Sequence, residues 1–222
     1  MLKEDIVREV DATIRIKGKI LAENITFEEF MEHDEWEHAE WVYGLAVQMS
    51  GIDKNHDAIS RFLSHLFSAY VALLGGGIIT GDPMIMRTKP SLPARAPDLQ
   101  VLLPESISKL KQNRVMGAAD LVVEIVSEGS EKTDRVHKLR EYEEGGVPEY
   151  WIIDHRFKET LFYQMDENGD YQRIQPDENG VYHSKVLDRL TLRVDLLWQD
   201  PLPNIFHVGD MVKAMFADGE AS

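Results

Sequence analysis

The sequence predicts a mixed α/β domain whose core elements follow the order helix, three strands, helix, strand. Residues 56–74 carry apolar side chains at three- and four-residue steps, which predicts a long helix with one apolar face. The nearly continuous apolar runs within 98–103 and 120–126 are typical of strands buried on both faces of a sheet. A second helical pattern over 131–144 and a buried strand over 150–154 complete the order.

Local signals define the ends of these elements. Asp53 or Asn55 can cap the long helix, and the glycine triplet at 75–77 ends it. Thr133 is the expected cap of the second helix, which Gly145 and Gly146 stop. The other expected elements are a helix over 3–11, a strand over 13–20, a capping-box helix over 27–32, a hairpin over 40–49, a strand over 77–87, a helical or loop segment over 105–115, and hairpin turns at 166–169 and 177–180.

Length and composition are those of one globular domain. The 222 residues suit a single domain over 25–200, with residues 1–24 as an N-terminal extension and residues 201–222 as a C-terminal tail. The chain has no cysteine, which excludes a disulfide framework, a thiolate zinc site and a cysteine nucleophile. The first twenty residues lack the apolar core of a signal peptide, and no apolar run approaches the ~20 residues of a membrane span, so we expect a cytoplasmic protein.

Net charge argues against tight, non-specific binding of nucleic acid. The chain carries 39 acidic and 24 basic residues, a formal charge of −15. Proteins that hold DNA through its phosphates normally present a basic face.

Two acids interrupt apolar strands and are the first candidates for chemistry. Asp98 opens one buried run, and Glu124 stands inside the other. Burial of a carboxylate lowers the stability of the fold by roughly several kcal/mol unless the carboxylate is paired, protonated or bound to a metal. Two such acids on neighbouring strands can bind one hard cation, and Mg²⁺ typically takes one or two carboxylates and several waters. The alternative for each acid is a structural role, as a turn cap or an arginine partner.

The second helix offers a basic partner. Asp134, Lys138 and Tyr142 follow at four-residue steps and therefore share one face. From that face Lys138 can reach the end of the strand that holds Glu124, where its charge would stabilise a phosphate under attack. The alternative is an exposed Asp134–Lys138 pair, worth about 0.3–0.5 kcal/mol.

Several motifs together resemble a known family. They are Ala96-Pro97-Asp98-Leu99, Ala119-Asp120-Leu-Val-Val-Glu124-Ile-Val-Ser127, Asp134-x3-Lys138-x3-Tyr142 and Gly146-Val-Pro-Glu-Tyr-Trp151-Ile-Ile-Asp154. In this order they resemble the Uma-two family of restriction endonucleases, within the PD-(D/E)XK nuclease superfamily. The resemblance covers roughly residues 25–190 and implies a restriction-endonuclease-like α-β-β-β-α-β core, here with added β-hairpins, and a divalent-metal site.

The resemblance implies that Asp98 and Glu124 hold the metal and that Lys138 completes the catalytic set. The position two after Glu124 is Val126, so the lysine of the superfamily motif is not in line. Lys138 fits the place from which the resembling family supplies this lysine, on the following helix.

Glu40 and His56 are secondary candidates. Glu40 can be a third acid near the metal or the first residue of a solvated strand. A histidine at a helix N-terminus is favoured in its neutral form, so His56 is expected to act as a base or metal neighbour, or else as a surface or capping residue.

These observations predict a Mg²⁺-dependent endonuclease that hydrolyses phosphodiester bonds, with DNA as the expected substrate and Mn²⁺ as the alternative ion. A catalytically silent scaffold on the same fold is the alternative, and its support is the net charge of −15. A small-molecule phosphohydrolase ranks below both, because the sequence shows no nucleotide-recognition signature. The aromatic-rich hairpins leave room for a homodimer interface, although core packing is the more common use of such aromatics.

Overall fold

The structure, a computed structural model, describes residues 19–49, 51 and 53–217. In that part of the chain the central sheet is six-stranded, with strand order β11-β10-β9-β8-β6-β4. Its strands are β4 (Ile78–Thr80), β6 (Leu99–Leu102), β8 (Leu121–Ile125), β9 (Glu149–Asp154), β10 (Glu159–Met165) and β11 (Tyr171–Ile174). Only β8 and β9 among these pair in parallel, and they are linked by a helix, as parallel neighbours require.

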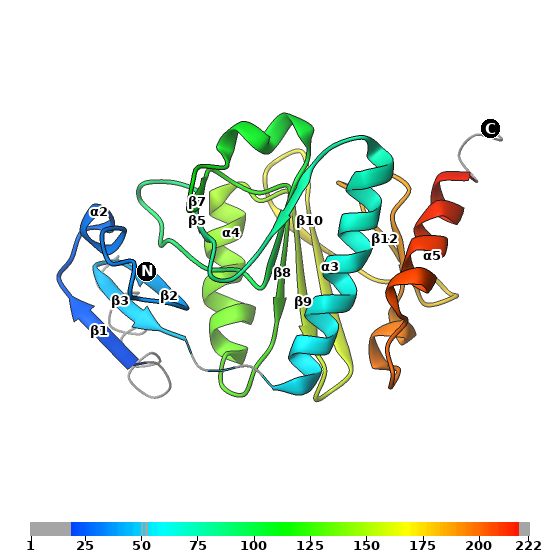
Figure 1. Ribbon diagram of the computed structural model, residues 1–222, viewed down its shortest axis with the longest axis horizontal. Helices are drawn as coiled ribbons and strands as arrows, with labels where there is room; N and C mark the ends of the chain where they lie inside the picture. Colours follow the sequence, from blue (N-terminus) through cyan, green and yellow to red (C-terminus); the bar gives the residue numbers. More distant parts are fainter. Residues whose placement is uncertain (1–18, 50, 52, 218–222) are drawn as a thin grey trace.

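Helices cover both faces of this sheet, as Figure 1 shows. Helix α3 (Lys54–Leu74) packs its apolar stripe, which includes Phe62, Leu66 and Phe67, against one face. Helix α4 (Leu139–Gly145) covers the other face, where Tyr142 contacts the ring of Tyr150. Because both faces are covered, the strands β8 and β9 are buried along their whole length, which explains their continuous apolar runs.

The order α3, β4, β6, β8, α4, β9 confirms the predicted α-β-β-β-α-β core. The caps agree as well: Asp53 accepts hydrogen bonds from the backbone N–H groups of Asn55 and His56, and Gly75 ends α3 with a left-handed φ of 86°.

The prediction of a single strand over 77–87 is wrong. The segment forms two short strands, β4 and β5 (Ile85–Arg87), and β5 pairs in parallel with β7 (Arg114–Met116), outside the central sheet. Pro83 lies between them and has no N–H to donate to a ladder, which interrupts the strand. The segment expected as helix or loop over 105–115 begins as a 3₁₀ helix, η1 (Pro104–Lys109), and ends in β7.

A second sheet is built near the N-terminus. The predicted capping box is present in α2 (Phe27–Phe30), and the predicted hairpin forms from β2 (Ala39–Val42) and β3 (Leu45–Gln48). Strand β1 (Lys19–Glu23) pairs with β3 on its other edge. The helix expected over 3–11 and most of the strand expected over 13–20 lie outside the described residues.

The helix expected over 131–144 is present but starts differently. A π-helical stretch, η2 (Thr133–Lys138), precedes α4, and the helix begins before Thr133, at residue 131. Thr133 therefore lies inside the helix, and its expected capping role is wrong. Gly146 ends α4 with a left-handed φ of 78°, as predicted.

Near the C-terminus one hairpin is confirmed and another is not. The turn at 166–169 joins the paired strands β10 and β11. The turn at 177–180 forms, but the strand after it, β12 (Val181–His183), pairs with β13 (Thr191–Arg193) rather than with β11. A 3₁₀ helix, η3 (Val194–Trp198), follows.

Helix α5 (Ile205–Ala217) was not predicted and lies within the proposed tail. It packs against α3 and buries Val208 and Val212. Figure 1 shows it outside α3, on the side away from the sheet. The division of the chain at 24 and 200 stays a prediction. Within the described residues, no helix combines the length and apolar character needed to cross a membrane.

Candidate active site

Asp98 and Glu124 lie across from each other on neighbouring strands. The antiparallel register pairs Leu99 with Val123, which places the residue before β6 opposite Glu124. Both acids line one cavity of about 110 Å³ at the carboxyl end of β8. Asp98 Oδ2 accepts a hydrogen bond from the backbone N–H of Ile125 at 2.6 Å, which fixes its carboxylate beside that end.

Lys138 reaches Glu124 from the helical stretch η2, directly before α4. Its Nζ lies 2.8 Å from Glu124 Oε2, 3.4 Å from Asp134 Oδ1 and 3.5 Å from Glu40 Oε1. The lysine side chain is 3% exposed, so it does not belong to an exposed helical pair with Asp134. Both residues lie in the π-helical stretch η2, a geometry that is often found at functional sites.

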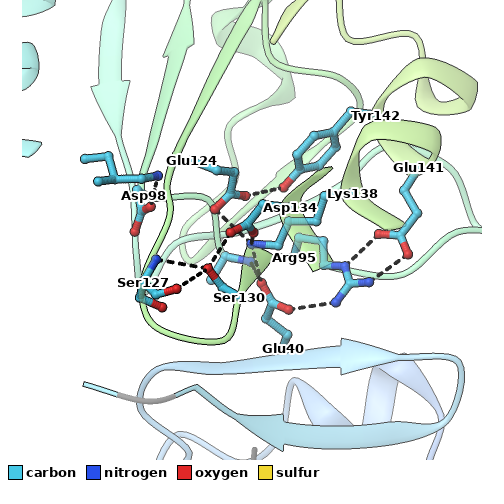
Figure 2. A network of polar contacts seen from close by, with 12 residues as sticks. Glu40, Arg95, Asp98, Glu124, Ser127, Ser130, Asp134, Lys138, Glu141 and Tyr142 are labelled. Carbon is cyan, nitrogen blue, oxygen red and sulfur yellow. Dashed lines mark hydrogen bonds and ion pairs between the residues drawn. The ribbon is translucent and has the colours of Figure 1, made fainter. Parts of the chain in front are cut away.

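Glu124 has a second partner. The hydroxyl of Tyr142, one turn after Lys138, donates a hydrogen bond of 2.8 Å to Glu124 Oε1. Figure 2 shows the Glu124 carboxylate between this hydroxyl and the Lys138 ammonium, with Asp134 beside them. The helix thus supplies both groups that fix Glu124.

Glu40 reaches the site from the N-terminal sheet and is buried, with 1% exposure, so it is not the start of a solvated strand. Arg95 holds it there: Nη1 donates to Glu40 Oε2 at 2.8 Å, and Nε and Nη2 donate to Glu141 of α4 at 2.7 Å each. Figure 2 shows Arg95 between the hairpin that carries Glu40 and the helix that carries Glu141. The guanidinium therefore connects the N-terminal sheet to the core.

His56 contacts Asp98 rather than solvent. Its Nε2 lies 3.2 Å from Asp98 Oδ1, and the side chain is 4% exposed. Burial alone would lower the pKa of His56, but the hydrogen bond and the charge of Asp98 outweigh it and raise this pKa. The adjacent carboxylate therefore opposes the preference for a neutral histidine that the helix N-terminus provides.

Burial and crowding of acids set the electrostatics. Burial raises the pKa of Glu124 well above its usual value, and the charges of Asp98, Asp134 and Glu40 add to this against the opposing effect of Lys138. Burial likewise raises the pKa of Asp134. For Lys138, burial acts in the opposite direction, but the surrounding carboxylates prevail and raise its pKa well above the usual value.

The donors around this cavity suit a hard divalent cation. Their carboxylate oxygens are the ligand type that Mg²⁺ and Mn²⁺ prefer, and three of these acids, Glu40, Glu124 and Asp134, share the single positive charge of Lys138. Across the described residues, however, no three acids or histidines are already arranged as a ligand set. The residues fit the metal in chemistry, while Lys138 and Tyr142 hold Glu124 in this arrangement.

The network includes residues that sequence reasoning did not select. Tyr142 belongs to the quoted motif, so its spacing was the available signal. Glu141 follows Lys138 by three residues in the predicted helix, so helical spacing was its signal as well. Arg95 gave none, because it lies between prolines in a bend, where no periodicity indicates which side chains point inward.

The fold and this site define a restriction-endonuclease-like protein. Residues 27–195 match the Uma2 family, whose description is "Putative restriction endonuclease". That match spans most of the sequence, and the chain belongs to this family.

One solved structure is similar over most of its length. It is described as a "putative nuclease belonging to DUF820" from Anabaena variabilis, with a TM-score of 0.63 and 18% sequence identity. The similarity covers 78% of this chain and 97% of that chain, and at this identity it supports the fold alone. The comparison with curated proteins gave no match.

Proposed function

We propose that this protein is a divalent-metal-dependent endonuclease that hydrolyses phosphodiester bonds of DNA at the cavity between β6, β8 and η2. The observation that carries the proposal is the 2.8 Å contact between Lys138 Nζ and Glu124 Oε2, beside Asp98 on the same cavity. Membership of a family described as restriction endonucleases supports the same reaction class.

Asp98 and Glu124 would hold the cation, and the cation would polarise the scissile phosphate and lower the pKa of a bound water. The chain prepares these two acids differently. The Ile125 N–H orients Asp98, whereas Glu124 is oriented by Lys138 and Tyr142. Preorganised ligands of this kind bind with less loss of side-chain freedom.

Lys138 would provide a fixed positive charge. Because neighbouring carboxylates raise its pKa, the ammonium stays protonated at neutral pH. It can donate a hydrogen bond to the attacking water or to a phosphate oxygen as negative charge develops there. A protonated lysine cannot accept a proton, so its role is positioning and charge stabilisation.

The experiment is cleavage of single- and double-stranded DNA in Mg²⁺ or Mn²⁺ by the parent, Asp98→Asn, Glu124→Gln and Glu28→Gln. Loss of either cavity acid is expected to reduce the rate by at least about 100-fold, the low end for removal of a transition-state contact. Glu28, whose side chain is 79% exposed, is the matched control and is expected to cleave at the parent rate. Parent-like cleavage by both cavity variants would refute the assignment.

A catalytically silent scaffold is the second candidate, and one observation favours it. Lys138 and Tyr142 already occupy Glu124, and no ready-made ligand set of three is present in the described residues. Calorimetry separates the candidates: a nuclease is expected to bind Mn²⁺ or Mg²⁺ at millimolar concentration, and this binding is expected to fall in Glu124→Gln. Undetectable binding to the folded parent would favour the scaffold.

A further inference from the structure

A second and larger cavity, of about 310 Å³, lies next to the acid cluster. The first turn of α3 separates the two: His56 lines the first cavity, and its neighbour Asn55 lines the second. The remaining walls come from the β9–β10 turn and from the connection between η3 and α5. A volume of this size falls at the lower end of the range for small-molecule sites.

The walls combine apolar surface with a few polar groups. Ile59, Leu197, Trp198 and Leu202 supply the apolar part. Trp198 is half-buried, so part of its surface remains accessible to a ligand. An apolar slot with an accessible aromatic ring is the environment in which proteins stack an unpaired base.

Two basic side chains of the β9–β10 turn border the slot. His155 is 9% exposed, and its Nε2 has no hydrogen-bond partner in the described part of the chain, although Asp53 Oδ2 lies 3.2 Å away. Lys158 is exposed and has no acidic partner among the described residues. Lys158 can meet the phosphate that accompanies a base in the slot, whereas His155 Nε2 is buried and faces Asp53.

The same turn presents an aromatic ring to solvent. Phe157 is 74% exposed, and the guanidinium of Arg156 lies 5.5 Å from its ring centroid. An isolated exposed phenylalanine needs no explanation, but Phe157 stands between Arg156 and Lys158 in the sequence. This alternation of basic and aromatic side chains is typical of surfaces that bind single-stranded nucleic acid.

The turn is tied to the acid cluster. Because β8 and β9 are parallel, their carboxyl ends lie at the same edge of the sheet, the lower edge in Figure 1. Arg156 also contacts Glu131, at 2.5 Å, at the start of the helix that carries Lys138. A single strand of nucleic acid that lies along this edge of the sheet can therefore reach both cavities.

We propose that the second cavity binds an unpaired base of single-stranded nucleic acid, with its phosphate against Lys158 and the adjoining phosphodiester at the acid cluster. The inference rests on the proposed nuclease function. A base that is seated in the slot cannot remain paired, so the site selects single strands or locally opened duplexes. With a net charge of −15, the chain must bind chiefly through stacking rather than through many phosphate contacts.

The test is binding without catalysis, in EDTA, measured by fluorescence anisotropy of a labelled twelve-residue oligothymidylate and of a matched duplex. Phe157→Ala is expected to weaken binding of the single strand about 5- to 10-fold, the low end for loss of one stacked base. Lys158→Ala is expected to weaken it as well, through loss of a phosphate contact. The matched controls on α5 are Phe206→Ala and Lys213→Ala, whose side chains are 80% and 70% exposed, and both are expected to bind like the parent. Ala58→Leu, which narrows the slot from α3, is expected to weaken binding while the circular dichroism melt shows the fold intact.

Three results would overturn the inference: equal effects in the turn and α5 variants, duplex binding as tight as single-strand binding, or competition by thymidine monophosphate as effective as by the oligonucleotide. Salt dependence gives a further check. One or two phosphate contacts predict a slope of log K against log salt of about −0.7 to −1.4, and a much steeper slope would contradict the stacking site.

Failure of this inference can be distinguished from failure of the proposed function. A parent protein that cleaves DNA while both turn variants bind normally refutes the slot and leaves the nuclease. A parent that binds single strands through the slot but never cleaves refutes the nuclease and leaves the binding site.

Discussion

Arg95 is the residue whose replacement tests the architecture of the site most directly. It comes from the segment between β5 and β6, and its side chain is 4% exposed. Its side chain links Glu40 of the N-terminal sheet to Glu141 of α4. Replacing it by methionine keeps much of the side-chain volume but removes the charge and the donors, leaving both carboxylates buried.

The size of the effect follows from the contacts. The hydrogen bonds from Arg95 to Glu40 and Glu141 are charge-assisted and 2.7–2.8 Å long. Breaking a buried pair by removing one partner costs about 3–5 kcal/mol, because the remaining charge is uncompensated. For a chain of this length each kcal/mol lowers Tm by about 2–4 °C, so Arg95→Met is expected to melt about 6–20 °C below the parent.

Thermal unfolding followed by circular dichroism measures the change, with Arg61→Met as the matched control. Arg61 is 67% exposed and contacts Asp57 on the outer surface of α3 at 2.6 Å, a type of pair worth at most about 0.5 kcal/mol. The Tm of Arg95→Lys is expected to lie between those of Arg95→Met and Arg61→Met, since one ammonium cannot reproduce the planar guanidinium that bridges two carboxylates. If Arg95→Met melts no lower than Arg61→Met, the arginine does not hold the two parts together and the reasoning fails.

Further substitutions test the packing around the site and the sheet. Gly81→Ala would place its Cβ 2.1 Å from the backbone oxygen of Asp98, so we expect the free energy of unfolding in urea to fall by about 1–3 kcal/mol. Gly209→Ala, which has open space around it in α5, should raise the free energy of unfolding by about 0.5–1 kcal/mol. Comparable effects of the two glycine substitutions would contradict this packing. Glu149→Gln should lose about 1–3 kcal/mol in the same assay, because an amide nitrogen cannot accept the hydrogen bonds that this buried carboxylate now accepts; an unchanged midpoint would show that they contribute nothing. The donors to Glu149 are Trp151, Tyr182, Ser184, Lys185 and Val186.

The core could be predicted from the sequence because its elements carry strong periodic signals. The stripe on α3 and the continuous apolar runs of β6 and β8 each require burial on a definite set of faces. Helix α5 carried such a signal too, since Val208, Val212 and Met215 recur at helical steps and Asn204 caps the first turn. The sequence pattern of this helix was therefore sufficient to predict it.

Other features depend on tertiary contacts that no local pattern records. Strand β5 leaves the central sheet because it pairs with β7, which lies almost thirty residues further along the chain. The position of Arg95 depends on a bridge between backbone groups of Met86 and Arg95, two loop-flanking segments without periodicity. The placement of Glu40 over Lys138 depends in turn on that arginine. The acids of the core strands and Lys138 were therefore predictable together, and the part played by Arg95 was not.

The composition of the acid cluster indicates a purpose other than stability. Replacing a buried ionic network by well-packed apolar residues is often neutral or stabilising, so fold stability alone does not explain why charges are kept here. The cluster is also unbalanced: Lys138 is shared by Glu40, Glu124 and Asp134, while Arg95 is shared by Glu40 and Glu141. A purely structural network would minimise such a surplus of acids over bases. Either a proton or a cation must relieve it, and of these a divalent cation also supplies the chemistry of phosphodiester hydrolysis.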